Sequence, residues 1–371
     1  MKIVLLITGL GLGGAERQVC DLADQFAALH HEVVIVYLTG EATILPSNPS
    51  IRVIGTGINK TVWSFLVTYI RIRSLLQSFQ PDILHSHMIH ANIMARLLRL
   101  FTTIPRLICT AHSTNEGGKL RMLAYRITDS LCDLSTNVSQ EAVNSFITKK
   151  AVPPKRMIAM VNGIDTEKFV FNPITRKQLR SEENISDSTH LLLCVGRLMK
   201  EKDYPTMLQA FQIISQKNND TYLWIVGVGE ELPVLLKMAE ELGIHKKMKF
   251  LGLRHDIPNL MSACDIFCLT SLYEGFGLVV AEAMSCERIV VATDCGGIKE
   301  VLGKCGILVT PGSPQDLAQG INQALQLSSH EKRTISSSAR QRIIKTYALE
   351  SIAQQWLSLY SHNKPLKMGT R

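Results

Sequence analysis

The sequence lacks the patterns that mark several classes of protein. No run of about 18 apolar residues occurs, so no segment is expected to cross a membrane as a helix. The cysteines form no Cys-x-x-Cys pair, and the histidines show no His-Glu-x-x-His or zinc-finger spacing. Neither a Gly-x-Ser-x-Gly motif nor a P-loop is present, and no Asp-x-Asp offers a carboxylate pair to a divalent metal. None of these metal, hydrolase or P-loop chemistries is therefore indicated.

The nine cysteines are odd in number and irregular in spacing. Most stand inside apolar runs, such as 191–194 and 266–268, where a small buried side chain is expected. We therefore predict reduced, buried thiols in a cytosolic protein. The apolar start of the chain, 2–8, is short, and no convincing cleavage site follows Gly9. It is predicted to be a first β-strand rather than a signal peptide.

The chain has enough material for about two domains. Of its 371 residues, 46% are hydrophobic and 19% are charged, which is typical of a folded protein and not of a disordered one. Short β-rich runs alternate with segments of helical periodicity, and this predicts parallel sheets with helices on both faces. The predicted strands are 2–8, 33–38, 83–85, 107–110, 191–195, 222–226, 249–251, 266–269, 289–292 and 307–309. The predicted helices include 15–30, 62–79, 91–100, 204–216, 232–242 and 349–361.

The pattern restarts after a polar stretch near 165–188, which is expected to be a linker. We predict two Rossmann-like domains, an N-terminal one over 1–168 and a C-terminal one over 169–348. Ligands of doubly wound sheets bind at the carboxyl ends of the strands. A cleft between the two domains is therefore the expected place for chemistry.

Positive charge is concentrated in one part of the chain. The formal net charge is +8 at pH 7, and the segment 60–126 holds nine basic residues against two acidic ones. Within it, 62–73 places aromatic residues beside Arg71 and Arg73 on one predicted helix. Aromatic and cationic side chains together suit the headgroup region of an anionic membrane surface. The alternative is that the aromatic residues belong to the core and the arginines are simply solvated.

A glycine-rich turn, Gly9-Leu-Gly-Leu-Gly13-Gly14, follows the first strand and opens a helix. It lets the backbone approach a ligand, beside a helix N-terminus suited to an anion. It also fits the dinucleotide fingerprint, but that site needs an acidic residue at the end of the second strand, and Glu41 comes slightly late. A simple tight turn remains a third interpretation.

A stronger pattern lies in the second half, where Glu274 and Glu282 are separated by seven residues. Gly275 and Gly277 interrupt the apolar chain after a strand, and a helix is predicted to begin near Gly277 with Glu282 in its second turn. Amide groups at that helix N-terminus could hold a phosphate, and Glu282 could accept hydrogen bonds from two vicinal hydroxyls. Taken singly, each glutamate could be an ordinary surface charge.

Two further groups of residues follow predicted strands. Arg197 comes directly after one strand with Lys202 five residues later, and two cations there could neutralise a diphosphate. An exposed basic loop is the alternative. His112 follows a strand of the first half and would face the cleft, whereas His85 and His87 end another strand and could equally be structural.

Together these motifs resemble the retaining glycosyltransferases of family 4, the glycosyl transferases group 1 of GT-B fold. The resemblance rests on Glu274 to Glu282, on Gly196-Arg197 with Lys202, and on four further segments. These segments are Asn162-Gly-Ile-Asp165, Gly13-Gly-Ala-Glu16, and Phe250-Leu-Gly252 with Asp294-Cys-Gly-Gly-Ile-Lys-Glu300. It covers nearly the whole chain and is closest to bacterial members that build lipopolysaccharide, O-antigen, capsule or other lipid-linked glycans.

The resemblance implies a role for each site residue. Arg197 and Lys202 would bind the donor diphosphate, Glu274 would contact the transferred sugar, and His112 would line the sugar pocket from the N-terminal domain. The donor-binding set would comprise Gly13, Gly14, Gly196, Phe276, Gly277, Leu278 and Glu282, the last of them on the ribose. It also implies that the C-terminal helix, 349–361, packs back onto the first domain, which would receive the acceptor.

The implied reaction is metal-independent hexosyl transfer with retained anomeric configuration. The donor would be a nucleotide sugar, by family frequency a UDP-sugar, and the acceptor would be a hydroxyl of a lipid-linked saccharide on the cytoplasmic face of the inner membrane. No metal, cofactor or nucleic acid is expected to take part. Two alternatives remain: an NAD-type oxidoreductase that uses Gly9–Gly14, and a non-catalytic module that binds sugar nucleotides.

Overall fold

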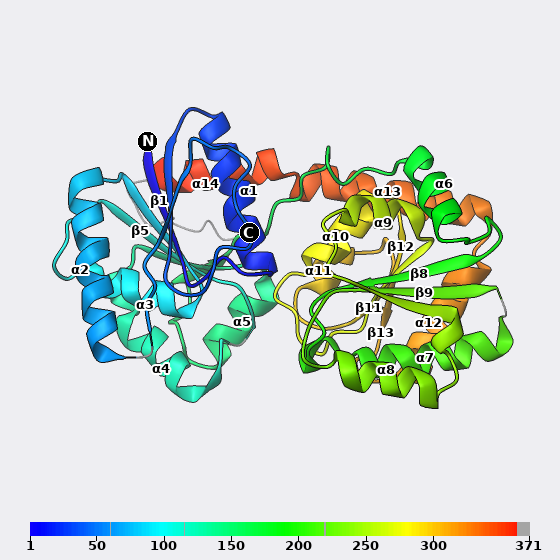
Figure 1. Cartoon of the computed structure of the whole chain (residues 1–371). Coiled ribbons are helices and arrows are strands. Elements are labelled where there is room, and N and C mark those ends of the chain that lie inside the picture. The colour runs from blue at the N-terminus through cyan, green and yellow to red at the C-terminus, as the bar shows by residue number, and fades with distance from the viewer. Residues whose placement is uncertain (60, 115, 219, 362–371) are drawn as a thin grey trace. The chain divides into compact units, whose positions relative to one another are not determined.

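The computed structural model describes residues 1–59, 61–114, 116–218 and 220–361. The chain divides into two units: unit 1 comprises Met1–Gly163 and the chain from Leu349 on, and unit 2 comprises Ile164–Ala348. Each unit is built on one sheet of parallel strands covered by helices (Figure 1). This confirms the predicted α/β class with two Rossmann-like sheets.

Unit 1 contains a seven-stranded parallel sheet in the order β3-β2-β1-β4-β5-β6-β7. Its strands are β1 (Lys2–Ile7), β2 (Glu32–Tyr37), β3 (Arg52–Gly55), β4 (Ile83–His87), β5 (Arg106–Ala111), β6 (Leu134–Asn137) and β7 (Met157–Ala159). Ile7 is paired with His87, and His87 with Thr110. The carboxyl ends of β1, β4 and β5 therefore lie level at one edge of the sheet.

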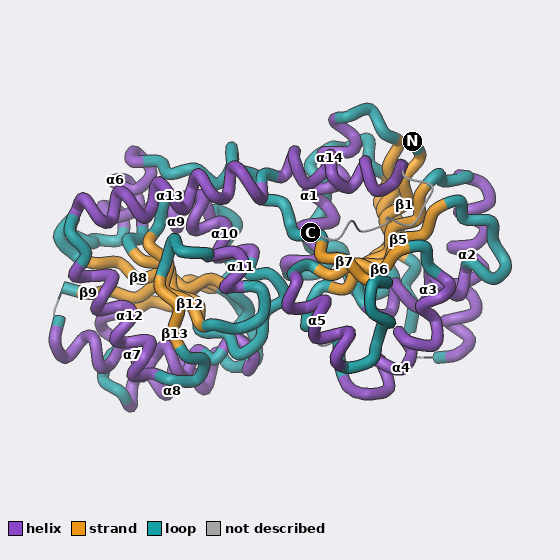
Figure 2. The backbone as a smooth tube through the Cα atoms, turned by 180° about the vertical axis from the view of Figure 1, so that it is seen from behind, coloured by secondary structure: helices purple, strands orange, loops and turns teal. Residues whose placement is uncertain are grey.

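Helices cover both faces of this sheet. They are α1 (Gly14–Ala28), α2 (Val62–Phe79), α3 (Ile89–Leu98), α4 (Gly118–Thr128), α5 (Gln140–Thr148) and α14 (Leu349–Ser361), with a 3₁₀ turn at Asp129–Leu131. On one face α1 and α14 lie side by side (Figure 2). The ring of Phe26 meets that of Tyr360 edge-on, with the ring centroids 5.6 Å apart. On the other face α2 and α3 bury residues such as Ile72 and Met94. The C-terminal helix is thus part of the core of unit 1.

Unit 2 contains a six-stranded parallel sheet in the order β10-β9-β8-β11-β12-β13. Its strands are β8 (His190–Val195), β9 (Thr221–Val226), β10 (Met248–Gly252), β11 (Ile266–Leu269), β12 (Ile289–Thr293) and β13 (Ile307–Val309). The unbroken burial of strands such as β11 and β12 explains why they read as continuous apolar runs in the sequence.

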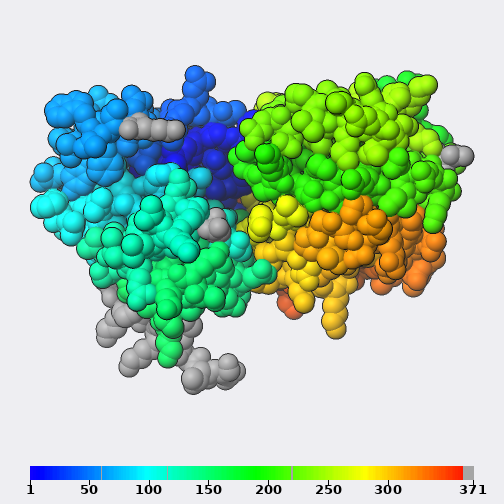
Figure 3. Space-filling model, turned by 90° about the horizontal axis from the view of Figure 1, so that it is seen from below, coloured from blue at the N-terminus to red at the C-terminus, as the bar shows by residue number. Residues whose placement is uncertain are grey.

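The helices of unit 2 bury an apolar core against this sheet. They are α6 (Pro173–Glu182), α7 (Tyr204–Lys217), α8 (Leu232–Glu241), α9 (Ile257–Ala263), α10 (Leu278–Ser285), α11 (Ile298–Leu302), α12 (Pro314–Gln326) and α13 (Ser329–Tyr347), with 3₁₀ turns at Lys200–Lys202 and His245–Lys247. Residues of α7, α8 and α12 form one core cluster with the strands, and the outer sides of these helices make up a surface of unit 2 (Figure 3).

The polar stretch near 165–188 is not a linker, because it contains α6, which packs on α9 within unit 2. The side chain of Arg180 is 1% exposed, donates to the carbonyl of Ala263 and pairs with Asp265 at 3.2 Å. The helix is anchored by a buried guanidinium rather than by an apolar stripe, which is why its polar composition suggested a linker.

Two other predictions concern burial and membrane spans. Eight of the cysteines are buried and Cys305 is half-buried, which confirms the prediction of buried thiols. In the part of the chain that the structure describes, no helix is both long and apolar enough to span a bilayer.

Lys60, the first residue of the basic segment, lies outside the described residues.

Candidate active site

The predicted residues of unit 2 lie on loops that follow neighbouring strands. Arg197 and Lys202 come after β8, Glu274 comes after β11, and β8 and β11 are adjacent in the sheet. Because parallel strands present their carboxyl ends at one edge, the two loops meet there. The third loop of this edge follows β12, the next strand in order.

Lys202 and Glu274 form an ion pair between the ammonium group and Oε1. The side chains are only 18% and 13% exposed. Ser271 Oγ donates to the same Oε1 at 2.8 Å, and Thr270 Oγ1 donates to the main-chain carbonyl of Lys202 at 2.6 Å. The end of β11 therefore holds both partners of the pair, and their charges point into a partly desolvated site where electrostatic interactions are strengthened.

The loop after β12 supports the segment that carries Glu274. Thr293 Oγ1 and Cys295 Sγ both donate to the carbonyl of Ser271, at 2.7 and 3.1 Å. Gly296 has φ +53°, and a Cβ added to it would lie 1.7 Å from the carbonyl oxygen of Glu274. Only glycine allows this close approach of the two loops.

The N-terminus of α10 follows Glu274 directly. Gly277 caps the helix in the left-handed region at φ +86°, and its amide and the next amides belong to the first turn, where helix N–H groups lack partners within the helix. Phe276 is 3% exposed and meets the ring of Tyr347 edge-on, so its side chain belongs to the core and only its amide could reach a ligand. Glu282 stands in the second turn of α10 and is 8% exposed, and Leu278 is half-buried.

Arg197 is not drawn into the Lys202–Glu274 pair. Its side chain is 55% exposed and lies 3.6 Å from Glu201. The preceding residue, Gly196, is bonded through its amide to the carbonyl of Val226 at 2.9 Å, and its own carbonyl accepts from Tyr204 Oη at 3.1 Å. The backbone at this position is fixed, whereas the guanidinium stands in solvent on the same loop.

The predicted residues of unit 1 lie at the carboxyl ends of β1, β4 and β5. After β1, Gly13 is the N-cap of α1 in an extended conformation at φ −158°, and the helix begins at Gly14 with Glu16 in its first turn. Glu41, which the dinucleotide interpretation required on a ribose, is exposed four residues beyond the end of β2. The glycines thus form a strand-to-helix turn, and the carboxylate of Glu16 lies over Gly13 at the N-terminus of the helix.

Histidines gather at the ends of β4 and β5. His85 is fully buried, with Nδ1 2.7 Å from Tyr360 Oη and Nε2 2.6 Å from Thr110 Oγ1, so it is a core residue. His87 is also buried, and its Nδ1 lies 3.0 Å from Nε2 of His112, which is half-buried. Burial lowers the pKa of His112 to about 4 and the pKa of His87 well below its usual value. Both imidazoles are therefore neutral at pH 7.

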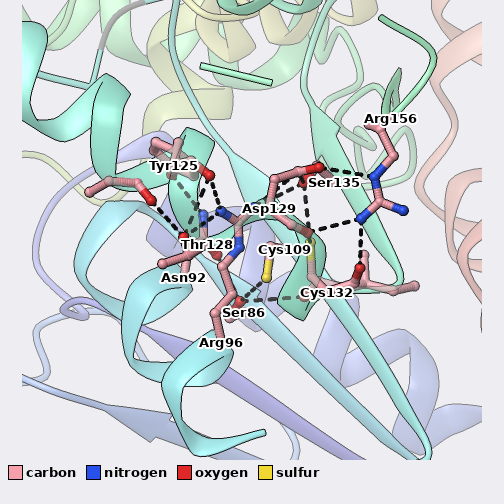
Figure 4. A network of polar contacts seen from close by, with 12 residues as sticks. Ser86, Asn92, Arg96, Cys109, Tyr125, Thr128, Asp129, Cys132, Ser135 and Arg156 are labelled. Carbon is pink, nitrogen blue, oxygen red and sulfur yellow. Dashed lines mark hydrogen bonds and ion pairs between the residues drawn. The ribbon is translucent and has the colours of Figure 1, made fainter. Parts of the chain in front are cut away.

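A buried polar network holds the loop that follows His112. The amide of His112 donates to Glu116 Oε1 at 2.9 Å, and Tyr125 Oη donates to Glu116 Oε2 at 2.7 Å. Asn92 Nδ2 donates to Tyr125 Oη, and the buried Arg96 donates to the carbonyl of Tyr125 (Figure 4). Burial raises the pKa of Glu116. This network reaches from α3 through α4 to the backbone of His112.

Comparisons with known proteins show the family of the chain. Residues 12–168 match the family described as Glycosyltransferase Family 4, and residues 175–342 match Glycosyl transferases group 1.

The chain belongs to this glycosyltransferase family. It is therefore a retaining glycosyltransferase that takes its sugar from a nucleotide-sugar donor. This assignment replaces the oxidoreductase and the non-catalytic module that the sequence had left open.

Curated relatives of this glycosyltransferase are named for different reactions. It is 27% identical over 380 residues to N-acetyl-alpha-D-glucosaminyl L-malate synthase of Bacillus anthracis, with 97% of each chain covered. It is 25% identical over 343 residues to N-acetylgalactosamine-N,N'-diacetylbacillosaminyl-diphospho-undecaprenol 4-alpha-N-acetylgalactosaminyltransferase of Campylobacter jejuni, with 88% of this chain and 90% of that protein covered.

Solved structures give the fold of the glycosyltransferase as GT-B. Anabaena Alr3699/HepE in complex with UDP superposes with a TM-score of 0.86 at 24% identity, over 97% of this chain and 100% of that one. WaaG, a glycosyltransferase involved in lipopolysaccharide biosynthesis, superposes with a TM-score of 0.74 at 18% identity, over 97% of this chain and 100% of that one.

Several residues that hold the candidate residues of each unit were not identified from the sequence. Thr270 and Ser271 orient the ion pair, and Glu116 holds the backbone of His112, but each is an ordinary polar residue in a loop or at the end of a strand. The sequence leaves both a structural and a functional role open for His87, and in the structure its Nδ1 is hydrogen-bonded to His112. Within the described residues no group of three or more His, Cys, Asp or Glu side chains is arranged to hold a metal ion.

Proposed function

We propose that unit 2 binds the nucleoside diphosphate of the donor and that Lys202 and Glu274 act on its reacting end. The observation that carries this proposal is the Lys202–Glu274 pair held directly before the N-terminus of α10. A diphosphate offered to this site would meet the Lys202 ammonium and the first-turn amides of α10. The anion would compete with Glu274 for Lys202, leaving the carboxylate available to the hydroxyls of the transferred sugar.

Charge development explains why these groups suit the reaction. In the transition state the sugar becomes cationic as the diphosphate departs, so donors aimed at the leaving oxygens stabilise it. Lys202, Arg197 and the helix N-terminus supply positive charge without a metal ion. We propose attack from the face that the leaving group vacates, with the leaving phosphate taking the acceptor proton. We also propose that His112 contacts the transferred sugar.

We propose UDP as the nucleotide and a hexose as the transferred group. HepE is described in complexes with UDP and with UDP-glucose, and these support a uridine nucleotide here. A panel of nucleotide sugars screened by thermal unfolding tests the donor class, because a ligand at 100 times its Kd raises stability by about 2.7 kcal/mol. A panel in which UDP and UDP-sugars leave Tm unchanged contradicts the proposal.

The ribose assignment predicts different effects for the two glutamates. Glu282→Gln removes a charged acceptor from the ribose hydroxyls and is expected to weaken UDP binding by about 1.5–3 kcal/mol, or roughly 10- to 150-fold. Glu274 faces the sugar, which UDP lacks, so the affinity of the Glu274→Gln variant for UDP should lie within a few-fold of that of the parent. Calorimetric titration with UDP checks both, and circular dichroism controls for folding. If both variants bind UDP like the parent, Glu282 does not hold the ribose.

We propose a lipid-linked saccharide as the acceptor, in the assembly of lipopolysaccharide, O-antigen or capsule at the cytoplasmic face of the inner membrane. The Campylobacter jejuni relative is named for a diphospho-undecaprenol substrate, and WaaG is described in lipopolysaccharide biosynthesis. An enzyme with such an acceptor gains from reversible attachment to the membrane surface.

The surface of unit 1 supports this attachment. On α2, Val62, Trp63, Leu66 and Ile70 are 46–79% exposed, whereas Ile72 packs in the core. The sequence had left open whether the aromatic residues of this helix are buried. Trp63 is exposed, but Phe65 and Tyr69 pack against the core.

A second apolar stripe lies on α4, where Leu120, Leu123 and Ile127 are 52–82% exposed. Exposed basic residues accompany both stripes: Arg71 and Arg73 on α2, and Lys119, Arg121 and Arg126 on α4. The outer sides of α2 and α4 are seen in Figure 3. Apolar and cationic side chains on one helix surface match an interface of anionic lipid.

We therefore expect the protein to co-sediment with anionic vesicles and not with neutral ones. Each basic residue near the surface contributes about 1 kcal/mol, so binding should weaken as salt rises. Arg71→Glu with Arg73→Glu should abolish most of the binding. The matched control, Lys246→Glu with Lys304→Glu, makes the same change of charge at exposed positions of unit 2 and should leave binding in place. A protein that stays in the supernatant with anionic vesicles at low salt does not dock in this way.

A further inference from the structure

Two neutral imidazoles share one hydrogen bond at the carboxyl edge of the sheet in unit 1. Nδ1 of His87 and Nε2 of His112 are 3.0 Å apart. A neutral imidazole carries one proton on two nitrogens, so one ring must donate and the other must accept. Two arrangements of protons satisfy this bond. They differ in which of the two remaining nitrogens, Nε2 of His87 or Nδ1 of His112, carries a proton.

In the first arrangement the Nδ1–H of His87 donates to His112. Nε2 of His87 is then a bare acceptor, and Nδ1 of His112 carries a proton. In the second arrangement the Nε2–H of His112 donates to His87. Nε2 of His87 must then carry a proton, and Nδ1 of His112 becomes an acceptor.

The surroundings of His87 Nε2 distinguish the two. This atom is buried and has no hydrogen-bond partner among the described residues. The ring of His85 lies 4.0 Å away between centroids, but both of its nitrogens are already occupied by Tyr360 and Thr110. The second arrangement would bury an N–H group without an acceptor, which is the rarer and more costly defect in protein interiors.

We propose that His87 is a positioning residue that holds His112 in the tautomer protonated at Nδ1. Nε2 of His112 is committed to His87, and the ring is half-buried, so Nδ1 is the nitrogen left for a ligand. His112 then offers a neutral N–H donor. Its ligand atom must be an acceptor, such as a hydroxyl or ring oxygen of a sugar. The meaning for catalysis rests on the proposed function, in which His112 contacts the transferred sugar.

Ring ¹⁵N spectra test the tautomer without any assay of activity. Protein labelled at the histidine ring nitrogens is recorded by long-range ¹H–¹⁵N correlation, and the His112 signals are assigned by their loss in His112→Gln. The expected pattern has Nδ1 protonated and Nε2 unprotonated. A pattern with Nε2 protonated, or a doubly protonated ring at pH 7, overturns the proposal.

Variants of His87 test its role. His87→Phe keeps a ring but removes both nitrogens, and should shift His112 toward the Nε2-protonated form and lower kcat by at least about 10-fold, with UDP affinity unchanged. His87→Asn places an amide N–H near the position of Nδ1 and should restore both the tautomer and most of the activity. His90→Asn, an exposed neighbour, is the control.

The outcomes separate the two hypotheses. If the parent protein and all variants lack transfer activity while His112 has the predicted tautomer, the proposed function is contradicted. The positioning role of His87 is then retained. An unchanged tautomer in His87→Phe overturns that role even if activity falls, because the loss would then come from packing.

Discussion

Lys202→Ala lowers kcat by about 10²-fold or more, with a smaller effect on the affinity for UDP. The ammonium group is held by Glu274, and the main chain of Lys202 is held by the hydrogen bond from Thr270, so the ammonium group is already oriented before a donor binds. A preorganised donor of this kind acts mainly on the charge that develops in the transition state, and removing one costs about 10²–10³ in kcat. Replacement by arginine preserves the charge but not the compact geometry and should recover only part of the rate.

Steady-state transfer assays at saturating donor measure this effect, and Lys200→Ala is the matched control. Lys200 lies in the same 3₁₀ turn but is exposed, so its loss should change kcat less than about 3-fold. Arg197→Ala is expected to lower kcat to a similar extent as Lys202→Ala, although its side chain stands in solvent before a donor binds. The rates should persist in EDTA. Lys202→Ala with a normal kcat, or full loss in EDTA reversed by magnesium or manganese, contradicts the metal-free electrostatic mechanism.

Gly296→Ala destabilises unit 2 and abolishes transfer. Its Cβ would fall 1.7 Å from the carbonyl oxygen of Glu274, and φ +53° is unfavourable for alanine by roughly 1–2 kcal/mol before any clash. The obstructing atom is backbone, so relief requires a shift of the loop that carries Glu274. We expect a loss of about 3 kcal/mol or more in the free energy of unfolding and a misplaced Glu274 in whatever folds.

Thermal and urea unfolding and transfer assays are carried out on Gly296→Ala and on Gly243→Ala. The comparison separates the cost of the positive φ from the cost of the steric clash with Glu274. Gly243 has φ +70°, but no heavy atom lies within 4 Å of its added Cβ. The Gly243→Ala variant should lose only the stability that the unfavourable positive φ costs, and it should keep full activity. Equal losses of stability in the two variants would show that the loop after β12 yields easily and does not fix Glu274.

The order of apolar and polar residues was sufficient to predict the architecture. The range 62–79, predicted from helical spacing, coincides with α2, and β11 and β13 have the predicted bounds. Each of these elements has a helical period or a continuous apolar run. The residues that this local pattern predicts to be buried are therefore the ones that the tertiary structure buries. No element was predicted between 111 and 165, where α4, β6, α5 and β7 lie, because these are short or weakly patterned and depend on their neighbours. The same reasoning failed for α6, whose attachment is a buried arginine.

The sequence by itself determined which residue types end each strand. A parallel strand delivers whatever follows it to one edge of the sheet, so Lys202, Glu274 and His112 could be named from their position alone. Their roles in catalysis stay predictions, as do those of Gly13, Gly14, Gly196 and Glu282.

Only the tertiary structure decided how these side chains are joined. Lys202 pairs with Glu274 across 72 residues of chain, whereas Arg197, on the same loop, remains in solvent. His87 and His112 share a bond because β4 and β5 are adjacent, and one buried nitrogen without a partner determines where the proton is expected. The direction and the desolvation of a side chain depend on atoms that the fold brings close from distant parts of the chain. The spacing of residues along the sequence does not specify these atoms.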